Sequence, residues 1–277
     1  MIGRRSIGPI ATYAIALALA TFVGFPLLWM VISSLKPSAE LFVNPPRLFP
    51  SELTLQWYRN LIGNPDAILL FRNSLVVGAS TTLICLTAGT LAAYSVTRFA
   101  YPGKQAFLIG ALLSYMFPAV VLFISIYMIV SVLGLIDTLF GLILCHCILT
   151  FPFALWMLKS FFEGIPREID EAAWVDGASF LRTFFTIILP LALPGIFSVA
   201  VFVFVLSWNE FLFASVLITS GDMKTIPLGI AEFITSFDIR WGEIMAIGTL
   251  ATLPVVILFL FVQRYFLYGV LSGAVKG

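Results

Sequence analysis

Long apolar runs separated by short polar segments dominate the chain. Each of six runs is long enough to cross the hydrocarbon core of a bilayer as a helix. They cover about residues 9–35, 74–97, 106–133, 139–158, 191–218 and 244–263. Pro118, Pro152, Pro194 and Pro254 fall inside runs, where such residues are tolerated when neighbouring groups re-satisfy the backbone. The pattern predicts an all-α membrane protein whose single domain has six transmembrane helices.

Composition agrees with this interpretation. Of the 277 residues, 61% are apolar and only 10% are charged, whereas a soluble domain carries about 25% charged residues. A chain of this composition cannot cover a water-facing surface. The net charge of +1 gives no indication of nucleic-acid binding. All three cysteines lie in apolar runs, so no disulfide framework is expected.

The distribution of Lys and Arg predicts the orientation. With both termini inside, nine basic residues are cytoplasmic: Arg4, Arg5, Arg98, Lys104, Lys159, Arg167, Arg182, Arg264 and Lys276. Six are then outside: Lys36, Arg47, Arg59, Arg72, Lys224 and Arg240. The first apolar run begins like a signal peptide but continues to Leu35, which is too long for one, so an uncleaved first helix is expected.

The polar segment 159–190, between the fourth and fifth runs, is cytoplasmic in this orientation. Pro166 stands where a helix can start and Gly177 where it can stop. Ala172 and Ala173 would let another surface approach the backbone closely. The segment therefore predicts a short exposed helix on which a soluble partner docks. The alternative is an amphipathic surface helix with a solvated acidic face.

A spaced set of residues in this segment carries a family resemblance. The set begins with Glu-Ala-Ala, which is followed after three residues by Gly, after nine more by Ile, and after one more by Leu-Pro. Its members here are Glu171, Ala172, Ala173, Gly177, Ile187, Leu189 and Pro190. This spacing resembles, without departure, the signature of permease subunits of bacterial ABC importers. Ser207–Phe211 and the tail Ser272–Gly277 resemble the carbohydrate-uptake branch, of the maltose and glycerol-3-phosphate type. Within that branch the chain is most similar to the smaller, six-span subunit.

The resemblance implies an assembly in the bacterial inner membrane, with the type I ABC importer permease fold. The implied partners are a second permease, usually a different chain, two copies of a cytoplasmic ATPase, and an extracytoplasmic binding protein that delivers a sugar. Glu171–Gly177 would form the coupling helix, seated in a cleft on the ATPase. The loop between the last two runs can reach the binding protein through Phe237, Asp238, Arg240 and Trp241, and the tail with Ser272 and Lys276 can run along the ATPase.

The residues around Glu171 have specific expected roles. Glu171 lies near the helix start, where the helix dipole favours a carboxylate. We expect Glu171 to pair with a basic residue of the ATPase. Asp176 projects from the same helix, Gly177 permits the turn that follows, and Ser179 can cap the next helix.

Nucleotide chemistry is not expected in this chain. It contains no Gly-x-x-x-x-Gly-Lys-Ser/Thr segment, so ATP and Mg²⁺ are expected on the partner ATPase, with no cofactor or metal here. Cys145, His146 and Cys147 are consecutive, and on a helix they point about 100° apart and do not converge on one metal. We expect His146 to be neutral, hydrogen-bonded and packed, with no carboxylate in its own run to form a catalytic pair.

Glu210 is the most informative polar residue inside an apolar run. A charged group at mid-bilayer costs about 3 kcal/mol on insertion scales, so Glu210 should face the bundle interior or a cavity. One interpretation is a pathway or gate, in which Asn209 donates hydrogen bonds and Trp208 supplies a stacking face for a sugar. The other is a polar lock between helices or subunits. The resemblance implies that the other permease holds most of the sugar.

Three further functions stay open at this stage. A secondary transporter would use Glu210 for an ion, although such proteins usually carry several intramembrane ionisable groups. A membrane-embedded enzyme would need a converging catalytic set, and the sequence offers none. An importer of a non-sugar solute, such as an amino acid, is the third.

Other polar positions are expected to be structural. Arg72 and Asn73 open the second run and Arg98 closes it, as ordinary interface anchors. The outer segment 36–73 is expected to form a partly ordered cap with Trp57 and Tyr58 as an interfacial aromatic anchor, the alternative being a solvated connection. The outer segment 219–243 is either a solvated connection or a docking site for a soluble protein.

Overall fold

The computed structural model describes residues 8–234 and 239–274, and helices make up almost all regular structure in these ranges. The chain divides into two compact units. One contains the residues up to Pro65 together with Ile230–Leu253. The other contains Asp66–Gly229 together with the residues from Pro254 onward.

The first unit is an apolar helix with an ordered cap. Its elements are α1 (Pro9–Ser33), η1 (Ser38–Glu40), α2 (Gln56–Ile62) and the start of α12 (Trp241–Ala274). The indole of Trp57 covers Gly242, and its N–H donates to the Lys36 carbonyl at 2.8 Å. The hydroxyls of Ser34 and Tyr58 lie 2.6 Å apart. The first outer segment is therefore fixed by specific side-chain contacts.

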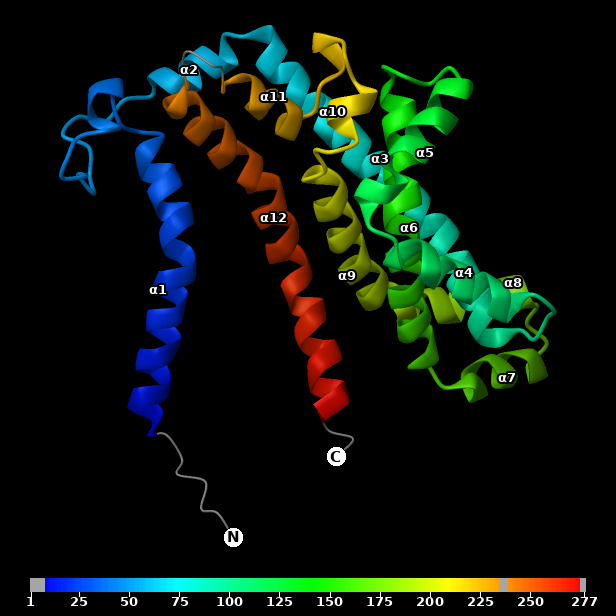
Figure 1. Cartoon of the computed structure of the whole chain (residues 1–277). Helices are drawn as coiled ribbons and strands as arrows, with labels where there is room; N and C mark the ends of the chain where they lie inside the picture. The colour runs from blue at the N-terminus through cyan, green and yellow to red at the C-terminus, as the bar shows by residue number, and fades with distance from the viewer. Residues whose placement is uncertain (1–7, 235–238, 275–277) are drawn as a thin grey trace. The chain divides into compact units, whose positions relative to one another are not determined.

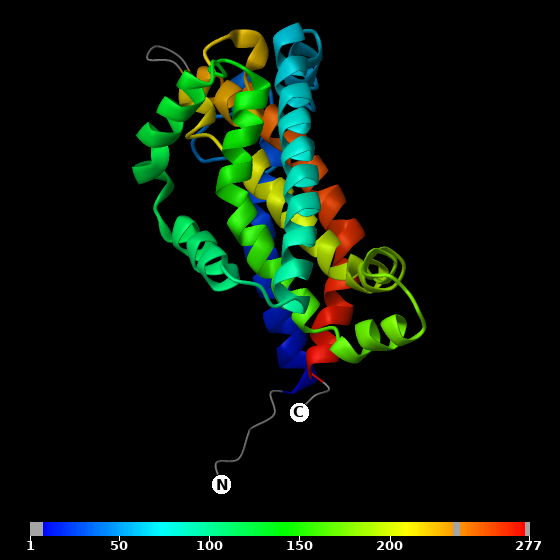
Figure 2. The same cartoon turned by 90° about the vertical axis from the view of Figure 1, so that its right-hand side faces the viewer.

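The second unit holds most of the helices (Figure 1). Its elements, in whole or in large part, are α3 (Pro65–Arg98), α4 (Lys104–Met116), α5 (Ala119–Val132), α6 (Leu139–Glu163), α7 (Arg167–Val175), α8 (Phe180–Thr183), the π-helical turn η2 (Phe184–Ile188), α9 (Leu189–Trp208), α10 (Ala214–Leu217), η3 (Gly221–Met223) and α11 (Ile226–Glu232). Figure 2 shows α3 and α6 running side by side.

Small residues bring α3, α6 and α9 close together, as is common in membrane bundles. An added Cβ at Gly89 of α3 would lie 3.1 Å from Leu158 of α6. At Gly195 of α9 it would lie only 2.4 Å from the ring of Phe161 on α6. The core that results is closely packed, and its fully buried members include Ala154, Leu155, Val199 and Val203.

Replacing Gly195 with alanine is therefore expected to destabilise the protein. The new methyl overlaps the Phe161 ring, and overpacking of this kind costs about 1–3 kcal/mol. Gly110 of α4 is a matched control, because an added Cβ there meets nothing within 4 Å. We expect Gly195→Ala to unfold at lower temperature than wild type in detergent, and Gly110→Ala to unfold near the wild-type temperature. Equal melting of the two variants would contradict the packing described.

The expected single helix over 106–133 is two helices. The α4–α5 pair is bent by 107° at the break around Pro118. Pro118 has no N–H to donate, and it pushes Phe117 out of the helical region, to φ −69° and ψ 130°. Among the described residues five helices are long and apolar enough to cross a membrane, and counting the bent pair as one span gives six. The predicted all-α, six-span fold class agrees with this.

Several helix ends differ from the expected ranges. α3 starts at Pro65 rather than near residue 74, and α6 continues past residue 158 to Glu163. The helix expected over 191–218 begins earlier and stops at Trp208, before the separate turn α10. The extensions contain charged residues among apolar ones, such as Asp66 and Arg72 in α3 and Lys159 and Glu163 in α6, which an apolar pattern places outside a span.

Asn73 is a buried clamp rather than an ordinary interface anchor. Its side chain is fully buried, and its amide donates to the carbonyls of Asp222 (2.8 Å) and Lys224 (2.9 Å). The neighbouring Ser74 hydroxyl accepts from the backbone N–H of Ile226 at 2.8 Å. This part of the second outer segment is therefore attached to the start of α3, which argues against the alternative of a solvated connection there.

Asp137 fixes the turn between α5 and α6 to the segment after α10. Its backbone has a positive φ of 60°, which Asp tolerates better than most residues. Its carboxylate accepts from the backbone N–H groups of Thr219 (2.9 Å) and Ser220 (2.8 Å), and from the Ser220 hydroxyl. The bonds from Ser220 and Thr219 lower the pKa of Asp137 from 3.8 to about 2.

This lowered pKa predicts a pH dependence. A carboxyl whose folded-state pKa is depressed adds stability that is complete above its unfolded pKa and is lost as the pH falls. For Asp137 the loss should occur between about pH 4 and pH 2. Asp137→Asn keeps the tolerated backbone and removes the charge. We expect it to melt below wild type at neutral pH, with the difference disappearing below pH 2. Asp222→Asn serves as the control, and a difference independent of pH would contradict the prediction.

Candidate functional site

The segment after α6 forms the short helix that the sequence predicted. Pro166 is its N-cap, and α7 runs from Arg167 to Val175 (Figure 1). Gly177 follows in the left-handed conformation, with φ 82°. Its N–H donates to Trp174 O at 3.0 Å, and the N–H of Ala178 donates to Ala173 O at 2.9 Å, which is the Schellman motif. The predicted start and stop of this helix are confirmed.

The turn into the next helix also agrees with expectation. The hydroxyl of Ser179 accepts from the backbone N–H of Arg182 at 3.3 Å and so caps α8. α8 continues through the π-helical turn η2 into α9. α7 is thus linked to α9 by one left-handed glycine and one capped turn.

A buried ion pair holds α7 against the end of α3. Arg98 Nε lies 2.8 Å from Asp170 Oδ2, and the two side chains are only 3% and 1% exposed. The Tyr94 hydroxyl donates to Asp170 Oδ1 at 3.0 Å, and Arg98 also donates to the Ile165 carbonyl at 3.0 Å. The prediction of Arg98 as an ordinary interface anchor is wrong, because its guanidinium fixes α7.

Aromatic rings surround this ion pair. The Tyr94 ring lies 4.8 Å from Phe184 and 5.9 Å from Phe99, between ring centroids. Phe99 contacts Phe180 at 5.7 Å, and Phe180 meets Trp174 of α7 edge-on at 4.9 Å. The rings connect α7, α8 and the turn η2 to α3, so these elements pack together.

The two faces of α7 differ in character. Asp170 and Ala173 are buried, whereas Glu171 and Ala172 are exposed, and Val175 is 88% exposed. Asp176 and Gly177 are exposed at the C-terminal end. Ala173 therefore packs inward, and only Ala172 of the alanine pair lies on the free face. This face presents a carboxylate beside apolar side chains.

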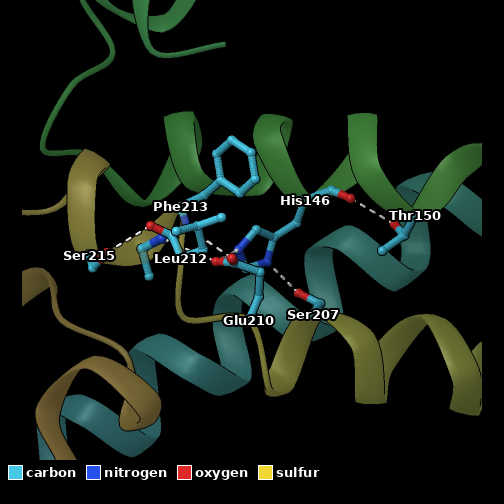
Figure 3. Close-up of polar contacts among 8 residues, drawn as sticks. His146, Thr150, Ser207, Glu210, Leu212, Phe213 and Ser215 are labelled. Carbon is cyan, nitrogen blue, oxygen red and sulfur yellow. Dashed lines mark hydrogen bonds and ion pairs between the residues drawn. The ribbon is translucent and has the colours of Figure 1, made fainter. Parts of the chain in front are cut away.

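A second polar cluster joins α6 to the end of α9 (Figure 3). His146 is 1% exposed; its Nδ1 lies 2.7 Å from the Ser207 hydroxyl, and its Nε2 lies 3.2 Å from Glu210 Oε2. A carboxylate only accepts, so Nε2 carries the proton in this pairing, and a neutral His146 then accepts from Ser207. The expectation of a hydrogen-bonded, packed His146 is confirmed.

Glu210 also begins the turn α10. Its Oε1 accepts from the backbone N–H of Phe213 at 2.8 Å, and its Oε2 accepts from that of Ala214 at 3.1 Å. One carboxylate therefore connects the end of α9, the turn α10 and, through His146, the middle of α6. This arrangement is a polar lock between helices.

A cavity of about 390 Å³ opens beside this cluster. His146, Ser207 and Glu210 line it on one side, and Tyr115 and Phe117, at the broken end of α4, line it on another. The cavity offers a carboxylate, hydroxyl groups and aromatic faces together. Such groups suit a polyhydroxylated solute, and Glu210 is both a lock and a cavity residue.

The three residues expected to act together at this site are separated. Trp208 is buried and stacks on Phe204, with ring centroids 5.2 Å apart. Asn209 is exposed, and its amide donates to Val205 O of its own helix at 2.9 Å. Glu210 alone of the three lines the cavity. The pairing of His146 with Glu210 was not predicted, although two polar residues within neighbouring apolar runs are a signal for such a pair.

The remaining site predictions fall in different places. Arg240 forms an ion pair with Glu243 and lies 4.8 Å above the Phe233 ring, and Trp241 meets Phe42 edge-on at 6.0 Å. Phe237, Asp238 and Lys276 lie outside the described residues, and Ser272 lies in α12 beyond the side chains that are described. Within the described part, no group of three His, Cys, Asp or Glu residues is placed to hold a metal ion.

Known sequences resemble this chain over most of its length. It is 36% identical over 256 residues to the inner membrane ABC transporter permease protein YcjP of Escherichia coli strain K12, covering 91% of each chain. It is 35% identical to the trehalose/maltose transport system permease protein MalG of Thermococcus litoralis, over 95% of each. It is 37% identical to the trehalose transport system permease protein SugB of Mycobacterium tuberculosis, over 91% of this chain and 92% of that one.

The fold is also known. A chain in the crystal structure of a bacterial ABC transporter involved in the import of the acidic polysaccharide alginate superimposes with a TM-score of 0.77. The match covers 93% of this chain and 95% of that chain at 20% identity, so it concerns the fold. The family model for inner membrane components of binding-protein-dependent transport systems matches residues 74–270. The chain belongs to this family of inner-membrane transport components.

Proposed function

We propose that this chain is a permease subunit of an ATP-driven sugar importer, coupled to a separate ATPase through α7. The observation that carries the proposal is the two-faced character of α7. One face is fixed to the unit by the buried Asp170–Arg98 pair, and the other presents Glu171, Ala172 and Val175 to a partner. A helix that is fixed on one face and free on the other can transmit a movement of a bound soluble protein to α3 and α9.

Family membership removes two of the alternatives left open by the sequence. A component of a binding-protein-dependent system is a transport subunit and not an enzyme, and it is not a self-contained secondary carrier. ATP and Mg²⁺ are then held by the partner ATPase. We also place a second permease and an extracytoplasmic binding protein in the assembly, and both termini on the cytoplasmic side, in line with the distribution of Lys and Arg.

The proposed solute is a sugar or oligosaccharide. Similar proteins are named for trehalose/maltose, trehalose and diacetylchitobiose transport. The cavity beside Glu210 offers hydroxyl, carboxylate and aromatic groups of the kind that bind sugar hydroxyls and ring faces. We assign Glu210 and His146 to the gate of the translocation pathway, since they join α6 to the end of α9, two of the helices that border the cavity.

We further propose that the segment before α12 contacts the binding protein and that the C-terminal tail contacts the ATPase. Arg240 and Trp241 precede and begin α12, next to the segment assigned to binding-protein docking. Trp241 is 37% exposed, so its ring retains surface for a partner.

A pull-down separates this proposal from a solvated surface helix. The detergent-solubilised complex is purified through this chain, as wild type, Glu171→Ala and Gly177→Val, and the co-purifying proteins are identified. We expect both variants to lose the ATPase, because Glu171 contacts it and valine cannot adopt the left-handed conformation at position 177 without strain.

Glu168→Ala is the matched control, an exposed carboxylate in the first turn of α7 that lies outside the family signature. We expect it to retain the ATPase. Recovery of the ATPase with all three variants would overturn the coupling assignment. The recovered binding protein is then screened by thermal shift against sugars and amino acids, and a response to amino acids alone would overturn the sugar assignment.

A further inference from the structure

A second cavity, of about 390 Å³, lies beside α7, between the end of α3, the start of α4 and the end of α6. It is separate from the cavity at Glu210, and the coupling assignment does not use it. Three basic residues and one acidic residue line it: Lys104, Lys159, Arg167 and Glu163. Its charge balance is therefore positive by two.

The three basic side chains use only some of their N–H hydrogen-bond donors in the contacts that the structure shows. Lys159 pairs with Glu163 at 2.6 Å, Lys104 donates to the Phe99 carbonyl at 3.3 Å, and Arg167 donates to the Thr97 carbonyl at 2.6 Å. An ammonium has three N–H donors and a guanidinium has five. In these contacts Lys104 and Arg167 meet only neutral backbone carbonyls. Such carbonyls do not compensate the positive charge.

The indole of Trp156 adds a further donor. Trp156 lines the cavity, and Lys159 Nζ lies 5.3 Å above its ring. Its Nε1 atom is buried and has no hydrogen-bond partner within the part of the chain that the structure describes. A buried N–H without an acceptor is costly, and a side-chain shift that turned this N–H toward the cavity would let a ligand supply the acceptor.

Part of the cavity lining is apolar. Leu108, Ile109 and Leu112 of α4 line it, and the last two are 47% and 41% exposed. The cavity therefore joins a cationic, donor-rich end to an exposed apolar strip on a helix of a membrane protein. A ligand that matches both parts carries an anionic acceptor and a hydrocarbon chain.

We propose that this cavity binds the phosphate headgroup of an anionic phospholipid, with an acyl chain along α4. Basic pockets between transmembrane helices are a known form of lipid headgroup site. Arg167 is the first residue of α7, so a bound headgroup contacts the helix assigned to coupling. Any effect of the lipid on ATPase activity rests on the proposed function, whereas binding itself does not.

Native mass spectrometry of the purified complex in detergent tests binding directly. Phosphatidylglycerol, phosphatidylcholine or inorganic phosphate is added, and the retained molecules are counted. We expect phosphatidylglycerol to be retained in preference to phosphatidylcholine. In Lys104→Gln/Arg167→Gln its affinity should fall about thirtyfold, and in each single variant about fivefold, with phosphatidylcholine unchanged.

Two further variants sharpen the test. Arg182→Gln removes an exposed charge on α8, away from the cavity, and should leave retention as in wild type. Trp156→Phe keeps an aromatic ring, although a smaller one, and removes the N–H donor, and it should weaken phosphatidylglycerol binding a few-fold. Should the double variant fail to fold, the single variants carry the test.

Equal retention of the two lipids, or an unchanged affinity in the cavity variants, would overturn the proposal. Displacement of phosphatidylglycerol by inorganic phosphate at comparable concentration would also overturn it, in favour of a site for a free anion. Because the readout is lipid retention, its failure is distinct from a failure of the ATPase pull-down.

Discussion

Arg98→Leu is expected to release α7 and to abolish recovery of the ATPase with the complex. The substitution leaves the carboxylate of Asp170 buried and unpaired, and breaking a buried pair on one side costs about 3–5 kcal/mol. It also removes the bond to the Ile165 carbonyl, at the residue just before the N-cap of α7. We measure the melting temperature of the purified complex and the amount of ATPase retained.

The double variant Arg98→Leu/Asp170→Leu separates stability from positioning. Removing both charges avoids the unpaired carboxylate, so much of the lost stability should return. Recovery of the ATPase should not return, because the orientation of α7 depends on the pair. Arg182→Leu, which removes an exposed charge from α8, should behave as wild type. Wild-type melting of Arg98→Leu would show that the pair is not what fixes α7.

Glu210→Ala is expected to stop transport while α7 still binds the ATPase. Its carboxylate serves His146 and two backbone N–H groups of the turn α10, and hydrogen bonds to charged groups are worth about 1.5–3 kcal/mol each. Loss of these three hydrogen bonds removes the polar connection between the end of α9 and α6. The measurements are sugar uptake in reconstituted vesicles and thermal unfolding.

A double-mutant cycle with His146→Ala tests whether the pair acts as a unit. We expect Glu210→Ala/His146→Ala to be little worse than Glu210→Ala alone, with an interaction energy of about 1–3 kcal/mol. Asn209→Ala is the control from the adjacent position, since Asn209 contacts only its own helix in the bond described. Strict additivity of the two substitutions, or a loss of transport in Asn209→Ala, would contradict the assignment.

The sequence predicted those features that depend on neighbouring residues. Apolar run length located the helices, and Pro166, Gly177 and Ser179 located the ends of α7 and the start of α8, because capping acts within a few residues. Pro118 was noted inside an apolar run. Whether a proline bends a helix slightly or divides it depends on what replaces the lost hydrogen bonds, and the surrounding helices decide that.

Partners across the fold were not predictable in the same way. Arg98 and Asp170 lie in different elements, as do His146 and Glu210, and each was interpreted from its own segment alone. The hydrophobic pattern indicates that polar side chains inside apolar runs face away from lipid. It does not identify the side chain of another helix with which each of them pairs. For the same reason adjacency in the sequence grouped Trp208 and Asn209 with Glu210, although the helix ends at Trp208 and the three side chains leave the chain in different directions.

The break between α4 and α5 has a consequence for the cavity beside Glu210. The last turn of α4 leaves carbonyl oxygens, and the first turn of α5 leaves N–H groups, without partners in their own helix. At membrane depth such backbone is tolerated only where it is buried in protein or borders a water-filled space. Phe117 and Ala119, on either side of the break, line the same cavity as Glu210. The bend therefore brings unpaired backbone groups of both half-helices to the wall of the cavity that holds the Glu210 carboxylate, so a polar solute there can meet main-chain donors and acceptors as well as side chains.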